Sequence, residues 1–597
     1  MLIRRAHMVV GDGAEIPQAD LRIHDGQIVE ISTDGLAPAG EEVIEATGRT
    51  VIPGLIDAHM HFDYLGVHNG LKARVRTHHH KAMLLDLLRN GITMVRTMAD
   101  PLREVTRLKR FQSTSRPGPH LVIAGPALTA PGGHPEITVA RDNRWLQKHM
   151  VRAVDGPTEA RTVVRSLAAS GVDLIKIVVQ GGDYAEFGDS LNKLSWDSVR
   201  AVIDEAHTRG LTVSAHTHYQ DDVDALLDLG IDSIEHGVIE DPVDDADGFL
   251  HRWAQSGVPL VSTLVIEQAI RNDAGDDYLS IGSENLRRAH EAGVPIVAGT
   301  DSMAGAMPAG SLHDELQLLV SAGLSPTAAL QAATGRAAEL LGLRDRGIIA
   351  EGKTADLLVL DSKPLDDISS TTDITMVIQD GRIVHRPRPR ETVRLADFAP
   401  SETRPLEYSD STGDAALTVT VDSARFSVDG TRTLIGSDPN TGKLVRSETL
   451  TSESNLATIE WSCRIPDEDT ELAARRDGQQ IELTGVFAGK QVNRTYSLRH
   501  DVWLQGIFFD AATFMTGEGE TLTFVAIGTS GRGALQATRF ELSKGEKEGV
   551  ATLVIPRWRR WWSAQVETDP TDGSLLLAKS GPGKEIRRLR HGTGGQR

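Results

Sequence analysis

The stretch VIPGLIDAHMHF, residues 51–62, opens the part of the chain that decides the fold. We predict that it forms a strand, because apolar residues fill it up to a polar end. That end holds His59 and His61, separated by one residue. Alternate side chains of a strand lie on the same face, so the two imidazoles are expected to point the same way. Two neighbouring imidazoles are what a zinc-type ion requires.

Seven more candidate strands follow, and helical patterns lie between them. The strands are TMVRTM (93–98), HLVIAG (120–125), LIKIVV (174–179), TVSAHTH (212–218), SIEHG (233–237), PLVSTL (259–264) and IVAGTDS (296–302). The helical segments, of which 78–91, 196–210 and 221–230 are the clearest, end in glycine, a common helix stop. Eight such repeats predict an α/β fold, a closed (β/α)8 TIM barrel over residues 51–346. A doubly wound sheet is the weaker alternative, because no glycine-rich phosphate loop follows the first strand.

Short strands with Asp-Gly turns flank this region on both sides, over residues 1–50 and 347–386. We predict that they pair into a small composite β-sandwich. Residues 387–410 are rich in proline and charge, as in a linker. Residues 411–597 show strand patterns alone, which predicts a C-terminal β-barrel or β-sandwich domain.

Composition restricts the function classes. The formal net charge is -20, which argues against nucleic acid and anionic membranes as partners. The single cysteine, Cys463, excludes an internal disulfide and a cysteine-rich metal site. No apolar run is long enough for a spanning helix or a signal sequence, so we predict a cytoplasmic protein without membrane contact.

Further polar residues end the later strands. Lys176 lies in the fourth candidate strand, His216 and His236 end the fifth and sixth, and Asp301 ends the eighth. Active sites of barrels lie at the carboxyl ends of the strands, so these residues are expected to meet His59 and His61 there. Satisfied core histidines would explain the first pair alone, but they do not explain six such residues on five strands.

These stretches resemble the amidohydrolase superfamily over about residues 1–390. The similar pieces are VIPGLIDAHMH, GITMVRT, GPALTAPGGHP, DLIKIVVQGG, SAHTH, SIEHG, AGTDS and GRAAELLGL…GIIAEGKTADLLVLD. Within the superfamily the chain is most similar to the Xaa-Pro dipeptidase and imidazolonepropionase-like branch. The flanking β segments match the small composite sandwich of that family.

The resemblance implies a site with two divalent metal ions, with zinc as the expected metal. It assigns His59 and His61 to the more buried ion and His216 and His236 to the second. Asp301 would ligate the buried ion and take the proton of a bridging water, which supplies the attacking hydroxide. Lys176 would be carboxylated by CO2 and bridge both ions, since an ammonium group beside them is disfavoured. The alternative is a structural Lys176 and a single ion.

The same resemblance gives His134, in APGGHP, and His218 as substrate contacts. Peptidase-like members often have tyrosine where His218 stands, so the departure bears on substrate preference. The expected reaction is hydrolysis of amide, peptide-like or related C–N or acyl bonds in a small-molecule substrate. A homo-oligomer is compatible with the resemblance.

Two other functions stay open at this point. One is a mononuclear deaminase or cyclic-amide hydrolase of the same fold. The other is a binding protein whose function lies in the C-terminal β domain, where RWRRWW (557–562) alternates cationic and aromatic residues. A tryptophan-lined core face explains that motif more simply. The run His78, His79 and His80 is expected to form the first turn of a helix, on its solvated face.

Overall fold

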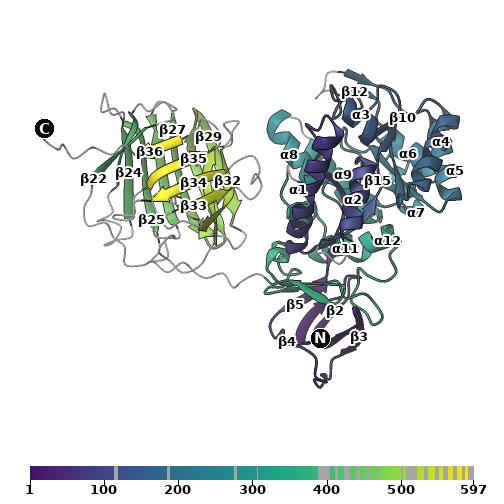
Figure 1. Cartoon of the computed structure of the whole chain (residues 1–597), viewed down its shortest axis with the longest axis horizontal. Helices are drawn as coiled ribbons and strands as arrows, with labels where there is room; N and C mark the ends of the chain where they lie inside the picture. The colour runs from purple at the N-terminus through teal and green to yellow at the C-terminus, as the bar shows by residue number, and fades with distance from the viewer. Residues whose placement is uncertain are drawn as a thin grey trace. The chain divides into compact units, whose positions relative to one another are not determined.

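The computed structural model consists of two compact units, Met1–Pro387 and Arg388–Arg597 (Figure 1). The described residues of the first unit are 1–112, 118–184, 189–274, 278–304 and 307–386. Those of the second unit are 404–409, 415–421, 431–437, 444–452, 458–466, 469–498, 502–503, 505, 521–529, 535–544, 550–554, 563–568, 575–580 and 585–588. None of the helices within these ranges is long and apolar enough to cross a membrane.

The first unit contains a TIM-barrel-like α/β domain. Its parallel strands are β6 (Leu55–Phe62), β7 (Ile92–Thr97), β8 (His120–Ile123), β9 (Ala127–Thr129), β11 (Leu174–Val178), β14 (Thr212–Thr217), β15 (Ser233–His236), β16 (Leu260–Ser262) and β17 (Ile296–Ala298). Hydrogen bonds from the amides of Thr300 and Asp301 to the carbonyl of His59 join the last strand to the first. The short strands β10 (Val151–Ala153) and β18 (Ser302–Ala304) extend the two sheets.

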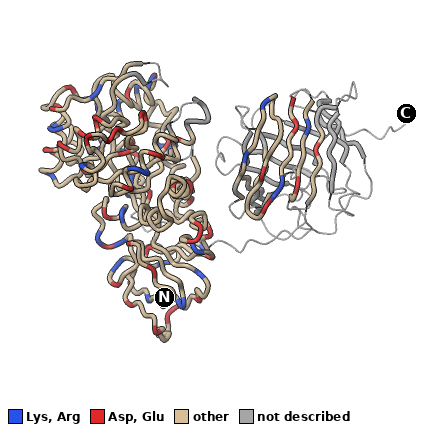
Figure 2. Tube along the Cα trace, turned by 180° about the vertical axis from the view of Figure 1, so that it is seen from behind, with Lys and Arg blue, Asp and Glu red and all other residues tan. Residues whose placement is uncertain are grey.

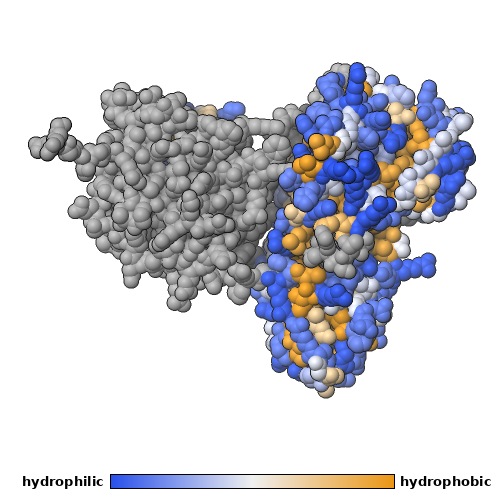
Figure 3. Space-filling view, in the orientation of Figure 1, coloured by the Kyte–Doolittle hydropathy of each residue, from blue (hydrophilic) through white to orange (hydrophobic). Residues whose placement is uncertain are grey.

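Helices surround these strands (Figure 1). They are α1 (Gly70–Arg89), α2 (Leu102–Gln112), α3 (Arg144–Met150), α4 (Pro157–Ala169), α5 (Trp196–Thr208), α6 (Gln220–Asp228), α7 (Phe249–Ser256), α8 (Leu264–Ala274), α9 (Tyr278–Ala292), α10 (Ser311–Ser321), α11 (Pro326–Ala332), α12 (Gly335–Leu340) and the 3-10 helix η1 (Ile368–Thr372). A continuous apolar core joins helices and strands. Polar residues cover most of the coloured surface of this unit in Figure 3, with apolar patches between them.

The first predicted strand is divided in two by Gly54. Thr50–Pro53 forms β5, which pairs with the flanking strands, whereas Leu55–Phe62 turns into the barrel as β6. A β-carbon on Gly54 would lie 2.4 Å from Thr93 Oγ1, so only glycine lets the chain pass this close to β7. The continuous strand expected over 51–62 is therefore wrong at this residue.

Strands from both ends of the unit form one sheet beside the barrel. Its order is β21-β20-β19-β5-β1-β2-β3, with β4 paired to β1. The strands are β1 (Leu2–Val9), β2 (Glu15–His24), β3 (Gln27–Ser32), β4 (Val43–Glu45), β19 (Leu357–Leu360), β20 (Ile374–Gln379) and β21 (Arg382–His385). Because β19 pairs with β5, residues far apart in the sequence share a core here. Acidic and basic residues are interspersed along the described chain (Figure 2).

Helix α1 corrects the expectation for the three consecutive histidines. The helix begins at Gly70, where the side chain of Asn69 accepts hydrogen bonds from the amides of Leu71 and Lys72. The three histidines therefore lie in the middle of the helix rather than in its first turn. His78 and His79 are exposed as expected, whereas His80 is buried. Its ring lies 5.2 Å from the ring of Phe62 and 4.9 Å from that of Tyr64. Hence His80 is part of the packing between α1 and the loop after β6.

All described elements of the second unit are strands. They are β22 (Arg404–Ser409), β23 (Ala415–Val421), β24 (Thr431–Ser437), β25 (Leu444–Ser452), β26 (Thr458–Ile465), β27 (Thr470–Asp477), β28 (Gln480–Phe487), β29 (Lys490–Ser497), β30 (Val502–Trp503), β31 (Thr521–Thr529), β32 (Leu535–Lys544), β33 (Val550–Val554), β34 (Ser563–Thr568), β35 (Leu575–Ser580) and β36 (Glu585–Arg588). Trp461, Trp503 and Cys463 are buried in its core. Residues 387–403 of the expected linker and the RWRRWW motif lie outside the described residues.

Candidate active site

The six residues expected to bind metal come together at the carboxyl ends of the barrel strands. His59 and His61 lie on β6, Lys176 on β11, His216 on β14 and His236 on β15, and Asp301 follows β17. His59, Lys176, His216 and His236 are buried, whereas the side chains of His61 and Asp301 are 21% and 22% exposed. The site is therefore a largely enclosed cluster of donors that opens beside His61 and Asp301.

Asp301 connects the first histidine pair to His236. Its Oδ1 lies 2.9 Å from Nε2 of His61 and 3.5 Å from Nε2 of His59. Its Oδ2 lies 3.9 Å from Nδ1 of His236. Asp301 adopts a left-handed backbone with φ 48°, which turns its carboxylate back toward β6. The neighbouring Thr300 holds this turn, because its hydroxyl donates to the carboxylate of Asp57 at 2.7 Å.

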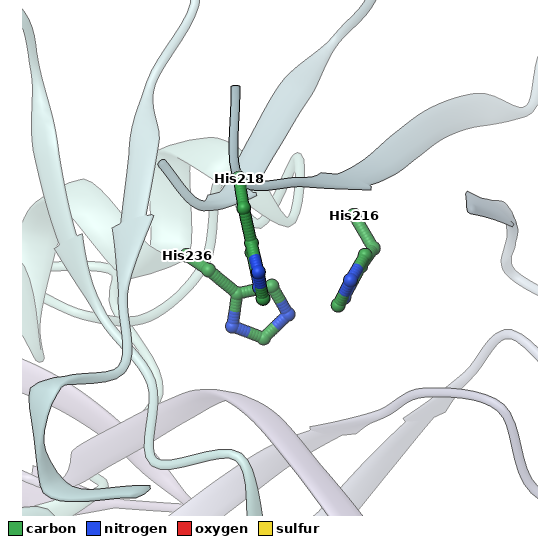
Figure 4. Close-up of side chains that lie close together, drawn as sticks. All are labelled: His216, His218 and His236. Carbon is green, nitrogen blue, oxygen red and sulfur yellow. The ribbon is translucent and has the colours of Figure 1, made fainter. Parts of the chain in front are cut away.

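A second group consists of His216, His218 and His236, whose rings lie close together in Figure 4. The ring of His216 lies 4.5 Å from that of His236 and 4.7 Å from that of His218. One nitrogen from each residue lies within 4.8 Å of the others, a spacing that allows a shared metal ion. His236 also belongs to the group with His59 and Asp301, so the two groups adjoin.

Lys176 lies on β11, the strand that pairs with β14. In the parallel register it is level with Ser214 of β14, two residues before His216. Its Nζ is buried and has no hydrogen-bond partner among the described residues. Burial lowers the pKa of Lys176 to about 8, and the positive charge of Arg96 acts in the same direction. Part of the Lys176 population is therefore the neutral amine near neutral pH.

The buried imidazoles are uncharged at neutral pH. Burial lowers the pKa of His59 to about 4 and holds the pKa values of His216 and His236 well below their usual range. A neutral imidazole has a free nitrogen lone pair, which is the form that binds metal. Nε2 of His216 is buried without a hydrogen-bond partner among the described residues. Neutral imidazole nitrogens fit a zinc-type ion, and Nε2 of His216 is also free of any hydrogen bond among the described residues.

The carboxylate of Asp301 is ionised. Burial alone would raise its pKa, but the hydrogen bond from His61 and the charge of that ring, whose own pKa is raised, outweigh burial and lower it. The same contact acts on His61, whose pKa is raised despite burial. Asp301 can therefore accept a proton at neutral pH.

Two residues of the site, Arg96 and Glu235, were not predicted from the sequence. Glu235 accepts a hydrogen bond from Arg96 Nη2 at 2.7 Å, and its other oxygen lies 2.7 Å from Nδ1 of His59. Both side chains are almost completely buried. Their signal in the sequence was a charged residue inside each apolar strand, Arg96 in TMVRTM and Glu235 in SIEHG. Buried charges of this kind are stable only when they are paired.

His134 lies against the second group. Its ring stacks on His216 with a centroid distance of 4.9 Å and an interplanar angle of 19°. Thr138 Oγ1 lies 2.8 Å from its Nδ1, and burial lowers the pKa of His134 to about 3. The expected substrate residues His134 and His218 thus flank His216 from a loop and from the end of β14.

A third possible metal group lies elsewhere, at the amino end of β8. It consists of His120, Asp356 and Asp380. Arg346 donates to Asp356 at 2.7 Å and already supplies a positive charge there. This cluster is an ion-pair network between the barrel and the flanking sheet.

The chain is similar to known proteins over the first unit. The model of the amidohydrolase family matches residues 50–384. Ochratoxinase of Aspergillus niger is 26% identical over 64% of this chain and 85% of its own length. Imidazolonepropionase of Deinococcus deserti is 25% identical over 60% of this chain and 88% of its own length. The crystal structure of a Xaa-Pro dipeptidase with bound methionine is similar with a TM-score of 0.56 and 27% identity, over 64% of this chain and 99% of that one.

Proposed function

Because this chain belongs to the amidohydrolase family, we propose that its barrel hydrolyses amide, peptide-like or related C–N bonds of small molecules with two divalent metal ions. It is a hydrolase by family membership. The observation that carries the two-metal proposal is the meeting of six donors at one end of the barrel. Two of their buried nitrogens, on Lys176 and His216, have no hydrogen-bond partner among the described residues.

The proposed ligands would be divided between two ions. His59, His61 and Asp301 would hold one ion, and His216 and His236 the other. Lys176, buried on the neighbouring strand β11, would hold both ions as a carbamate. Nitrogen-rich sites of this kind suit zinc. Bound divalent ions polarise a carbonyl group and lower the pKa of water toward neutrality.

Lys176 is suited to carboxylation. Its amine is buried, partly neutral and unpartnered among the described residues. A neutral amine attacks CO2, forms an N–C bond and releases one proton. The product is an anionic oxygen donor, which replaces a cation that two nearby metal ions would repel.

Asp301 would move the proton. It is ionised, and it contacts His61 at 2.9 Å at the open side of the site. In this proposal its carboxylate takes a proton from the attacking water and delivers it to the leaving amine. Glu235 and Arg96 lie behind His59 and keep its Nδ1 occupied, so that Nε2 faces Asp301.

The substrate would lie against His134 and His218. The low pKa of His134 keeps its ring neutral, so it offers a hydrogen bond without a charge. Nδ1 of His218 lies 3.4 Å from Oε1 of Glu240, at the end of β14. The names of the relatives favour a C–N bond as the target, since they include a dipeptidase and an imidazolonepropionase.

One observation favours a second candidate, a mononuclear hydrolase or deaminase. His236 belongs to both groups of possible ligands, so a single ion bound by His236 would use donors from each.

A hydrolysis screen tests the proposed reaction. The substrates are dipeptides, N-acyl amino acids, cyclic amides, carbamates and lactones, each assayed with and without a chelator. We expect turnover of at least one amide class, its loss on chelation and its return with zinc. The Asp301→Asn variant should lose about a hundredfold or more in kcat, the usual contribution of a positioned proton acceptor. Chelator-resistant turnover, or full activity of Asp301→Asn, would contradict the proposal.

A further inference from the structure

Gln180 carries a buried amide group that the metal ligands do not account for. Its side chain is 1% exposed. Both Oε1 and Nε2 lack a hydrogen-bond partner among the described residues. Buried amide groups in proteins are normally hydrogen-bonded, because water is lost without replacement otherwise. A buried amide without any hydrogen bond is therefore expected to bind a ligand group that supplies the missing hydrogen bonds.

The position of Gln180 places it at the mouth of the barrel. It follows Val179, whose amide donates to the carbonyl of His216 at 2.9 Å and so continues the pairing of β11 with β14. In that register Val178 is level with His216, and Gln180 and His218 each follow two residues later on their own chains. Side chains alternate along an extended chain, so Gln180 shares the face of Lys176.

A β-hairpin begins two residues after Gln180. The strands β12 (Gly182–Tyr184) and β13 (Asp189–Leu191) pair directly after Gln180. A β-carbon on Gly181 would lie 3.0 Å from Cβ of Lys193, so the chain that follows β13 packs tightly on this segment. The Gln180 amide is thus buried just after β11 and directly before this hairpin.

We propose that Gln180 is a specificity-determining residue that pairs with a neutral amide-type group on the non-scissile part of the substrate. The proposal rests on the hydrolase function given above. A side-chain amide presents one acceptor and two donors, so its best partner offers both a carbonyl and an N–H. Carboxamides, ureas and cyclic amides have this pair of groups.

A carboxylate fits this position less well. It accepts hydrogen bonds but donates none, which leaves Oε1 of Gln180 buried and unpaired. Sites built to hydrogen-bond a polar group reject analogues that leave buried atoms without partners. The expected substrate class is therefore a compound with a second, uncleaved amide, rather than one that ends in a free acid at this position.

The kinetic test compares N-acetyl-leucinamide with N-acetyl-leucine, which differ only in carboxamide against carboxylate. Each is measured as a substrate, and as a competitive inhibitor of the best substrate found in the screen. We expect the wild type to prefer the carboxamide about tenfold or more, and Gln180→Met to bring the ratio close to one. Equal preference in the wild type, or an unchanged ratio in Gln180→Met, would overturn the proposal while the hydrolase function would stand.

A stability test does not depend on turnover. Gln379 is the matched control, a buried glutamine whose Nε2 donates to the carbonyls of Thr93 and Gly118 at 3.2 and 3.0 Å. We expect Gln379→Met to lower the melting temperature and Gln180→Met to leave it unchanged or raise it, since only the first removes hydrogen bonds. If Gln180→Met lowers the melting temperature as much as Gln379→Met does, the amide is bonded within the fold and the proposal is wrong.

Discussion

At the scale of single residues, the candidate site contains a buried ion pair behind one of the proposed metal ligands. Glu235 links Arg96 to Nδ1 of His59, and the hydroxyl of Ser233 donates to the same carboxylate at 2.9 Å. A carboxylate on one imidazole nitrogen fixes the tautomer and leaves the other nitrogen free for metal. The three buried residues therefore act together on the orientation of one ligand.

The Glu235→Gln variant should weaken metal binding. We expect about a ten- to hundredfold loss of affinity, because the amide orients His59 less firmly and leaves Arg96 without its counter-charge. The affinity is measured by competition with a chromogenic chelator. Glu45→Gln, which changes an exposed ion pair with Arg5 in the flanking sheet, is the control and should bind metal normally. Equal affinities of the two variants would contradict the role of Glu235.

Glu315 gives a prediction for pH. Burial raises its pKa to about 7 from 4.5, although Ser262 and the amide of Val265 donate to it. Since the folded pKa is the higher one, this carboxyl favours the folded state fully below pH 4.5, and the contribution is lost as pH rises through 7.

The Glu315→Gln variant is neutral at every pH and should not show that loss. Relative to the wild type, its free energy of unfolding should rise by up to about 3 kcal/mol between pH 5 and pH 8. Urea unfolding at both pH values measures the difference. A constant difference would show that Glu315 is ionised in the folded protein throughout.

Some site residues were predictable and others were not. His59, His61, His216, His236 and Asp301 end candidate strands, and barrel geometry alone brings strand ends together. Glu235 lies one residue before His236, and with the left-handed backbone of His236 (φ 68°) both side chains contact His59. A charge in this strand indicates that it has a partner but does not say which one. That partner, Arg96, is separated by 139 residues in the sequence, so only the folded chain identifies it.

At the scale of elements, the turn after β17 is the most constrained part of the site. A β-carbon on Gly299 would lie 2.7 Å from Cβ of His59 and 2.9 Å from its backbone nitrogen. The amides of Thr300 and Asp301 both donate to the carbonyl of His59, so this contact also closes the barrel. The contacts that close the barrel at His59 therefore also position His59 and Asp301, two of the proposed metal ligands.

The Gly299→Ala variant should disturb both properties. We expect a loss of about 1–3 kcal/mol in stability, the usual cost of an extra carbon in a packed core, together with weaker metal binding. Thermal unfolding and metal titration measure the two effects. Gly70→Ala is the control, because a β-carbon at the first residue of α1 meets no atom within 4 Å. A Gly299→Ala variant as stable as that control would contradict the close approach.

The sequence predicted the type and order of the barrel strands but not where they break. The stretch 51–62 looks continuous because apolar residues fill it, yet Thr93 blocks every residue except glycine at position 54. Helix α1 begins at Gly70, earlier than expected, because Asn69 caps it. The first turns of this helix lack the regular apolar spacing by which a helix is predicted from sequence. Tertiary contacts decide the first case and a local cap the second.

At the scale of the whole molecule, the candidate site lies within one unit. The family match ends at residue 384, and the first compact unit ends at Pro387. A chain shortened to residues 1–387 should therefore fold, bind metal and retain kcat/KM within a few-fold. Circular dichroism, metal titration and the hydrolysis assay check this. If the shortened chain is folded and loaded with metal but inactive, residues 388–597 contribute to the reaction.

The most direct test of the two-metal proposal is the number of metal ions per chain. Inductively coupled plasma mass spectrometry is applied to the wild type and to Lys176→Ala, each purified with zinc and bicarbonate and then dialysed. We predict two ions per chain in the wild type and one or none in Lys176→Ala, because the bridging carbamate is lost. One ion in the wild type, with full occupancy and activity in Lys176→Ala, would contradict the two-metal site and favour the mononuclear hydrolase.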